Sequence, residues 1–149
     1  MGKKLEQQFQ ECIAQKKITR LSAAEDLVDK ELRAAKGDLE AAQAGIRDKR
    51  WKWCTIQAYY SMFHAARSLL YSAGYREKSH HCLRVAIETL FVKQGALAEK
   101  HIDALQVAKI MRENADYEEE FTREGAQKIV KAAAEFIEAA EELLTNTAN

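Results

Sequence analysis

The feature that most restricts the fold of this 149-residue chain is a three-and-four-residue spacing of apolar side chains that no proline interrupts. One such stripe runs through Val28, Leu32, Ala35, Leu39 and Ala42. This spacing places apolar side chains on one face of an α-helix, and proline is the residue that breaks helices most strongly. With only six glycines, the chain also lacks the turn residues that a many-stranded β fold needs. The sequence therefore predicts an all-α fold.

The same spacing recurs along the chain and predicts six helices. Their expected ranges are about 5–16, 22–48, 51–73, 79–93, 97–112 and from 122 onward. Because short connections make consecutive helices antiparallel, we expect an antiparallel up-and-down helical bundle. It would have four to five core helices plus an N-terminal helix.

The length is that of one domain, and no repeat or linker divides the chain. We assign residues 1–21 to an N-terminal accessory helix and residues 22–145 to the bundle. Residues 146–149 are expected to form a frayed tail.

Charge is balanced overall but unevenly distributed, with 23 basic and 23 acidic side chains in total. Residues 47–93 carry nine basic and three acidic side chains, whereas residues 113–149 carry three basic and ten acidic ones. This division suits an anionic ligand on the basic part and a basic partner, or a self-complementary contact, on the acidic part. The plainer alternative is that both sets only solvate helix faces.

Three cysteines, Cys12, Cys54 and Cys82, lie far apart and show no Cys-x-x-Cys spacing. An odd number without such a motif predicts reduced thiols in a cytosolic protein, each buried as a small hydrophobic residue. Polar residues interrupt the most apolar segment, 53–75, so we expect no membrane span. The expectation is a cytoplasmic protein without a metal or cofactor.

The segment 74–82 holds the first candidate site. Ser79 has the side chain and position of a helix N-cap, which puts His80 and His81 in the first turn. Backbone amides at a helix N-terminus attract anions, and Arg76 and Lys78 lie just before it. We therefore predict that Arg76, Lys78 and Ser79 bind a phosphate. The alternative is a polar loop with a capping serine.

The same segment permits a catalytic interpretation. A histidine can take the 2′-hydroxyl proton of RNA while an arginine stabilises the phosphorane, which cleaves the strand without a metal. His80 and His81, with Arg76 as their partner, are candidates for this reaction. Adjacent histidines point in different directions on a helix, so they do not predict a metal site.

A second candidate site lies at the end of the fifth predicted helix. Arg112 is placed to reach helix carbonyls or a ligand phosphate, and Asp116 and Tyr117 are expected to start a loop. We predict that Arg112 and Tyr117 contact a nucleotide or phosphate. The alternative is an ordinary helix C-terminus with a favourable cation.

Two parts of the chain resemble a known family. Residues 53–75 read Trp-Cys-Thr-Ile-Gln-Ala-Tyr-Tyr-Ser-Met-Phe-His-Ala-Ala-Arg-Ser-Leu-Leu-Tyr-Ser-Ala-Gly-Tyr and are followed by Arg-Glu-Lys-Ser-His at 76–80. This resembles the signature of the HEPN domain (higher eukaryotes and prokaryotes nucleotide-binding), of the prokaryotic stand-alone type. The resemblance continues through Arg-Glu-Asn-Ala-Asp-Tyr at 112–117 and the alanine-rich final helix. It covers about residues 23–144.

The resemblance implies an antiparallel bundle that forms a homodimer and is paired with a small nucleotidyltransferase in a toxin–antitoxin or stress module. Many members are metal-independent endoribonucleases whose arginine and histidine, four to six residues apart, meet across the dimer interface. Arg112 matches the family arginine and Tyr117 matches an aromatic position near the histidine. Asp116 stands where a histidine is needed, and an aspartate repels phosphate and cannot return a proton at neutral pH.

These observations favour a dimeric nucleotide- or RNA-associated partner of a small nucleotidyltransferase, with a degenerate ribonuclease motif. The alternative is a metal-independent endoribonuclease toxin that uses Arg76 with His80 or His81, or a composite site with Arg112. A third interpretation is an interaction module whose charged ends serve assembly only.

Overall fold

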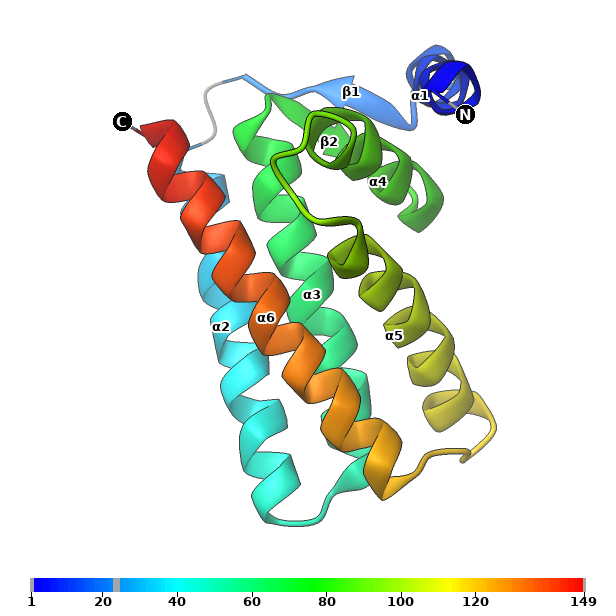
Figure 1. Ribbon diagram of the computed structural model, residues 1–149, viewed down its shortest axis with the longest axis vertical. Helices are drawn as coiled ribbons and strands as arrows, with labels where there is room; N and C mark the ends of the chain where they lie inside the picture. The colour runs from blue at the N-terminus through cyan, green and yellow to red at the C-terminus, as the bar shows by residue number, and fades with distance from the viewer. Residues whose placement is uncertain (1, 23–24, 149) are drawn as a thin grey trace.

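The computed structural model describes residues 2–22 and 25–148 and is an all-α bundle with one small sheet (Figure 1). The elements are α1 (Gly2–Ala14), β1 (Ile18–Arg20), α2 (Glu25–Arg47), α3 (Trp51–Ser72), β2 (Tyr75–Glu77), α4 (His80–Ile87), a π-helical turn η1 (Glu88–Val92), α5 (Glu99–Tyr117) and α6 (Arg123–Ala148). The predicted all-α bundle is confirmed.

Helix α3 is the centre of the bundle. Helices α2, α5 and α6 run alongside it, with α6 crossing the front in the view of Figure 1. Thirteen of the 22 residues of α3 are buried, which explains why its apolar residues extend around most of its circumference. Helices α2 and α3 approach closely at Gly45, where a Cβ atom would lie 2.9 Å from the Cβ of Cys54. Glycine at this position therefore sets the distance between the two helices.

The C-terminal end of α3 lies where the sequence predicts it, whereas that of α5 does not. Gly74 ends α3 with a φ of +86°, a left-handed conformation that favours glycine. Helix α5 was expected to end near residue 112 but continues to Tyr117. An ion pair between Arg112 and Asp116, one turn apart, lies within this added segment. Asp116 and Tyr117 are thus helical and do not start a loop.

The chain before the bundle is attached to α4 and to the segment that precedes it. Strand β1 pairs with β2 in an antiparallel register that sets Ile18 opposite Glu77 and Arg20 opposite Tyr75. Helix α1 packs against α4 in the same region (Figure 1). Each strand has three residues, which is too short for an alternating pattern to be recognised in the sequence.

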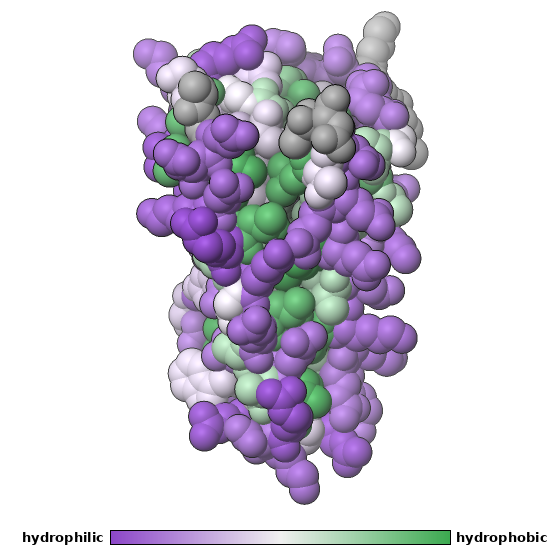
Figure 2. Space-filling model, turned by 90° about the vertical axis from the view of Figure 1, so that its left-hand side faces the viewer, coloured by the Kyte–Doolittle hydropathy of each residue, from purple (hydrophilic) through white to green (hydrophobic). Residues whose placement is uncertain are grey.

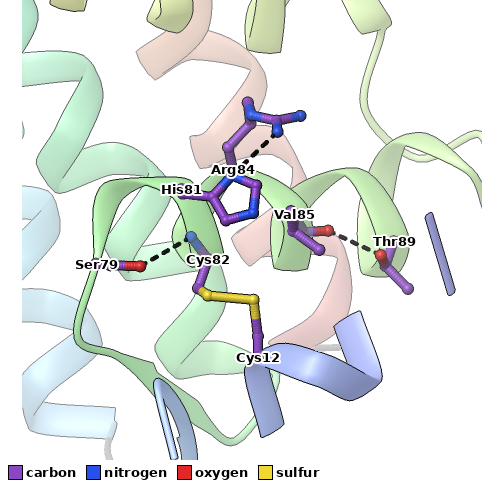
Figure 3. The surroundings of a disulfide bond; sticks show 7 residues. All are labelled: Cys12, Ser79, His81, Cys82, Arg84, Val85 and Thr89. Atoms are coloured by element: carbon purple, nitrogen blue, oxygen red, sulfur yellow. Dashed lines mark hydrogen bonds between the residues drawn. A yellow bond between two sulfur atoms is a disulfide. The ribbon is translucent and has the colours of Figure 1, made fainter. Parts of the chain in front are cut away.

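The prediction of three reduced thiols is wrong for two of them. Cys12 of α1 and Cys82 of α4 form a disulfide, with their Cα atoms 5.9 Å apart (Figure 3). Their separation of 70 residues gave no sign of contact, because only the packing of α1 on α4 brings them together. Cys54 alone is a free, buried thiol, as expected. The expectation of a cytosolic protein was based on three reduced thiols, and the disulfide removes that support.

The outer surface combines charged margins with apolar strips. Figure 2 shows one side of the molecule, where apolar residues form a strip along the long axis between hydrophilic borders. Within residues 2–22 and 25–148, no helix is both long and apolar enough to cross a membrane.

Candidate phosphate-binding site

The side chain of Arg112 lies between two tyrosines at the surface between α3 and α5. Its Nη2 donates a hydrogen bond of 3.0 Å to the hydroxyl of Tyr60 on α3. The guanidinium carbon is 5.5 Å from the Tyr60 ring centroid and 5.4 Å from that of Tyr117. Two aromatic rings and a hydroxyl thus hold the guanidinium in one orientation.

The charge of Arg112 is stabilised by these neighbours. Burial acts to lower the pKa of Arg112, but Tyr60, Tyr117 and Asp116 together raise it above its usual value. Asp116 pairs with Nη2 at 3.3 Å, and the Nε atom is buried without a hydrogen-bond partner among the described residues. The guanidinium is therefore a fixed cation, and its Nε–H is a buried donor without a partner among the described residues.

His80 lies on the other side of a tyrosine pair from this arginine. Its Nδ1 atom is 3.1 Å from the hydroxyl of Tyr59. Burial, helped by the positive charges of Lys109 and Arg84, lowers the pKa of His80 to about 4. Burial also raises the pKa of Tyr59 to about 12, so the phenol stays protonated near neutral pH. His80 is therefore a neutral imidazole, and its buried Nε2 has no hydrogen-bond partner in the described part of the chain.

Tyr59 and Tyr60 connect the two groups. Their rings, on consecutive residues of α3, are 5.1 Å apart in an edge-on arrangement. Tyr59 faces His80 of α4, and Tyr60 faces Arg112 of α5. These two tyrosines thus connect the arginine of one predicted site with a histidine of the other, and neither was among the predicted site residues. Nothing in their spacing distinguishes them from ordinary packing residues.

The other predicted site residues are not brought to Arg112. Arg76 lies in β2, opposite Thr19, with its guanidinium 6.0 Å from the Tyr71 ring. Strand β2 lies at the end of the bundle that holds β1, whereas α5 runs toward the opposite end (Figure 1). The backbone N–H of Lys78 donates to the carbonyl of Lys17, so this residue belongs to the same sheet region.

Ser79 is the predicted N-cap of α4. Its Oγ accepts a hydrogen bond of 3.1 Å from the backbone N–H of Cys82 (Figure 3). That amide is therefore already used and does not remain for a phosphate. His81 is exposed and its Nδ1 lies 3.3 Å from Arg84, away from the tyrosine pair. The predicted phosphate contacts of Arg76, Lys78 and Ser79 remain a prediction.

A separate polar cluster fixes α2, α3 and β2 together. Arg67 of α3 pairs with Glu31 at 3.2 Å and with Glu77 at 3.3 Å. The Nδ1 atom of His64 lies 2.5 Å from a carboxylate oxygen of Glu31. Because these groups satisfy one another, the cluster is structural. Among the residues that the structure describes, no group of three or more His, Cys, Asp or Glu side chains is suited to hold a metal.

Comparison with known proteins identifies the bundle. A HEPN-domain family model matches residues 28–143. The chain is 28% identical over 105 residues to "Putative toxin MJ0605" of Methanocaldococcus jannaschii, covering 70% of this chain and 78% of that protein. The crystal structure of TT1696 from Thermus thermophilus has the same fold, with a TM-score of 0.66 at 18% identity. That likeness covers 78% of this chain and 97% of the other.

Proposed function

Because this chain belongs to the HEPN-domain family, we propose that it is a toxin-like protein that binds the phosphates of a nucleotide or RNA at Arg112. The observation that carries the proposal is the environment of that arginine. Its guanidinium is held by Tyr60 and Tyr117 and keeps its charge, and 22% of the side chain is exposed. A pre-oriented guanidinium binds phosphate well, because little side-chain freedom is lost on binding.

Membership of the family supports a proposal about the partners of this protein. We propose that the protein acts as a homodimer and is associated with a small nucleotidyltransferase in a toxin–antitoxin or stress module. Support for a contact surface comes from the outer face of α5, where Val107 is 50% exposed, Ile110 is 59% exposed and Tyr117 is 67% exposed. Large apolar side chains in such positions favour association with another protein.

The binding proposal has a direct test. Arg112→Ala should weaken the affinity for a single-stranded RNA oligonucleotide about tenfold or more, because a charge-assisted hydrogen bond contributes roughly 1.5–3 kcal/mol. Arg33→Ala removes an exposed arginine on α2 and serves as the matched control for the loss of one positive charge. Equal affinities of the two variants, measured by fluorescence anisotropy, would contradict the proposal.

A second candidate function is metal-independent cleavage of RNA. The observation that favours it is the series of contacts that links His80, a neutral imidazole, to Arg112 through Tyr59 and Tyr60. In this reaction the imidazole takes the 2′-hydroxyl proton, the 2′-oxygen attacks phosphorus as the bond to the 5′-oxygen breaks, and the imidazolium returns the proton to the 5′-oxygen. Arg112 would stabilise the phosphorane. Asp116, paired with Arg112, opposes this function because its charge repels the same phosphate.

Cleavage is distinguished from binding by incubating the protein with RNA in EDTA. An RNase would leave fragments with 2′,3′-cyclic phosphate ends and would lose activity in His80→Ala. Binding without fragments, at a stoichiometric amount of folded protein, supports the first function.

A further inference from the structure

A surface hollow lies at the end of the bundle where α2 turns into α3. Ala41, Ala44 and Gly45 of α2 form one wall, and Trp53 and Gln57 of α3 form the other. The volume of this Trp53 hollow is about 460 Å³. The small side chains of Ala41 and Ala44 leave this space beside α3 unfilled.

Trp53 is unusual for a residue of a core helix. Its side chain is 54% exposed, whereas the neighbouring Trp51 is half-buried and packs against the core. Burial of a tryptophan side chain is strongly favourable, so an exposed indole bordering a hollow indicates a surface for an aromatic or apolar ligand group.

The rim of the hollow is positively charged. Arg50 lines it, and Arg47 and Lys49 lie in the same turn, all three exposed and without an ion pair to any residue that the structure describes. Lys52, whose Nζ lies 5.2 Å from the centroid of the Trp53 ring, forms an ion pair with Glu119. Of these charged groups, Arg50 and the carboxylate of Asp48 line the hollow itself.

We propose that the Trp53 hollow is a second binding site, which takes an unpaired nucleobase stacked on the indole and its phosphate on Arg50. Stacking on an aromatic ring beside basic side chains is how proteins bind single-stranded nucleic acid. Gln57 and Asp48 supply hydrogen-bonding groups for the edge of the base. Two sources carry this chemistry, a free nucleotide and a single strand of RNA.

The position of the hollow favours the strand. Trp53, Gln57 and Tyr60 are spaced by four and three residues, so they lie on one face of α3. With a rise of about 1.5 Å per residue, Trp53 and Tyr60 are roughly 10 Å apart along the helix. One strand therefore reaches both the hollow and Arg112, which contacts Tyr60. This inference rests on the proposed function and adds that the nucleic acid is single-stranded.

The two tryptophans allow each position to report separately. In Trp51→Phe the only remaining tryptophan is Trp53, and in Trp53→Phe it is Trp51. Addition of a single-stranded RNA dodecamer should quench the fluorescence of Trp51→Phe and leave that of Trp53→Phe nearly unchanged. Adenosine monophosphate, added alone, shows whether a free nucleotide suffices. Quenching of both variants alike, or of neither, would overturn the inference.

Affinity gives the second readout. Trp53→Ala should weaken binding of the labelled dodecamer about 5- to 100-fold, which is the effect of removing one stacked base. Arg50→Ala should reduce the steepness of the plot of log affinity against log salt concentration by about 0.7. The control is Lys128→Ala, which removes an exposed cation on α6 and should leave this slope unchanged. The same dodecamer in duplex form should bind less well than the single strand. Equal binding of single strand and duplex would refute the preference.

The outcomes separate this inference from the Arg112 proposal. Loss of affinity in Arg112→Ala but not in Trp53→Ala keeps the proposed function and rejects the hollow. The reverse pattern keeps the hollow and rejects the Arg112 site. Failure of the wild-type protein to bind either RNA or adenosine monophosphate rejects both. If the wild-type protein is a dimer in light scattering and Trp53→Ala is a monomer, the hollow is a contact with a second copy of the chain. That result rejects the RNA site.

Discussion

Breaking the disulfide between Cys12 and Cys82 should lower the free energy of unfolding by an amount that follows from the length of the loop it closes. The two residues are 70 positions apart. In the chain-entropy description, closing a loop of this length removes enough freedom from the unfolded chain to stabilise the fold by about 4 kcal/mol. With a urea m-value of about 2 kcal/mol/M, the unfolding midpoint should fall by about 2 M when the bond is absent.

The assay is urea unfolding followed by far-ultraviolet circular dichroism, with and without a phosphine reductant. The double variant Cys12→Ala/Cys82→Ala is the control, since its midpoint should be low and insensitive to the reductant. Titration of thiols in denaturant should find one in the untreated protein, Cys54, and three after reduction. Three thiols in the untreated protein, or a wild-type midpoint that reduction leaves unchanged, would refute the reasoning.

Three further changes test the packing and the charges. Gly45→Ala should destabilise by about 1–3 kcal/mol, because its Cβ would lie 2.9 Å from that of Cys54. Because the pKa of His80 is about 4 in the folded protein and about 6.5 when unfolded, the unfolded chain takes up the proton first as pH falls. Stability should therefore decrease from pH 6.5 toward pH 4, and His80→Gln should flatten this slope in urea midpoints. Arg67→Met should lower the free energy of unfolding by about 3–5 kcal/mol, because Glu77, whose side chain is 7% exposed, loses the cation with which it pairs.

Each of these changes has a control within the chain. A Cβ added at Gly37 would meet no atom within 4 Å, so Gly37→Ala should be neutral or stabilising by up to about 1 kcal/mol. His81→Gln, on an exposed neighbour of His80, should keep the pH slope. Adding Glu77→Gln to Arg67→Met should recover part of the loss. A neutral Gly45→Ala, a slope unaffected by His80→Gln, or a harmless Arg67→Met would each contradict its argument.

The sequence predicted those parts of the fold that depend on local repetition. Apolar residues spaced by three and four, such as Val28, Leu32 and Ala35, lie on helices as expected. The capping role of Ser79 was also readable, because a cap is made within four residues. The contact of Cys12 with Cys82 was not, since it depends on how α1 packs on α4 and no local pattern records that packing.

The candidate site was predictable in part for the same reason. Arg112 stood out as a cation near a helix end, in agreement with the family resemblance. Its relation to His80 depends on Tyr59 and Tyr60, consecutive residues of one helix that face two different neighbours. A stripe of apolar residues indicates which face is buried but not which partner each ring meets. Only the arrangement of α4 and α5 around α3 showed that.

Binding of phosphate at Arg112 is the central claim, and an NMR titration locates it most directly. The protein, labelled with nitrogen-15, would be titrated with a single-stranded RNA oligonucleotide in EDTA while backbone amides and arginine Nε–H groups are followed. We expect the largest chemical-shift changes at residues 109–117, at Tyr60 and at the Nε–H of Arg112. Shifts confined to residues 76–81, or no shift at saturating RNA, would contradict it.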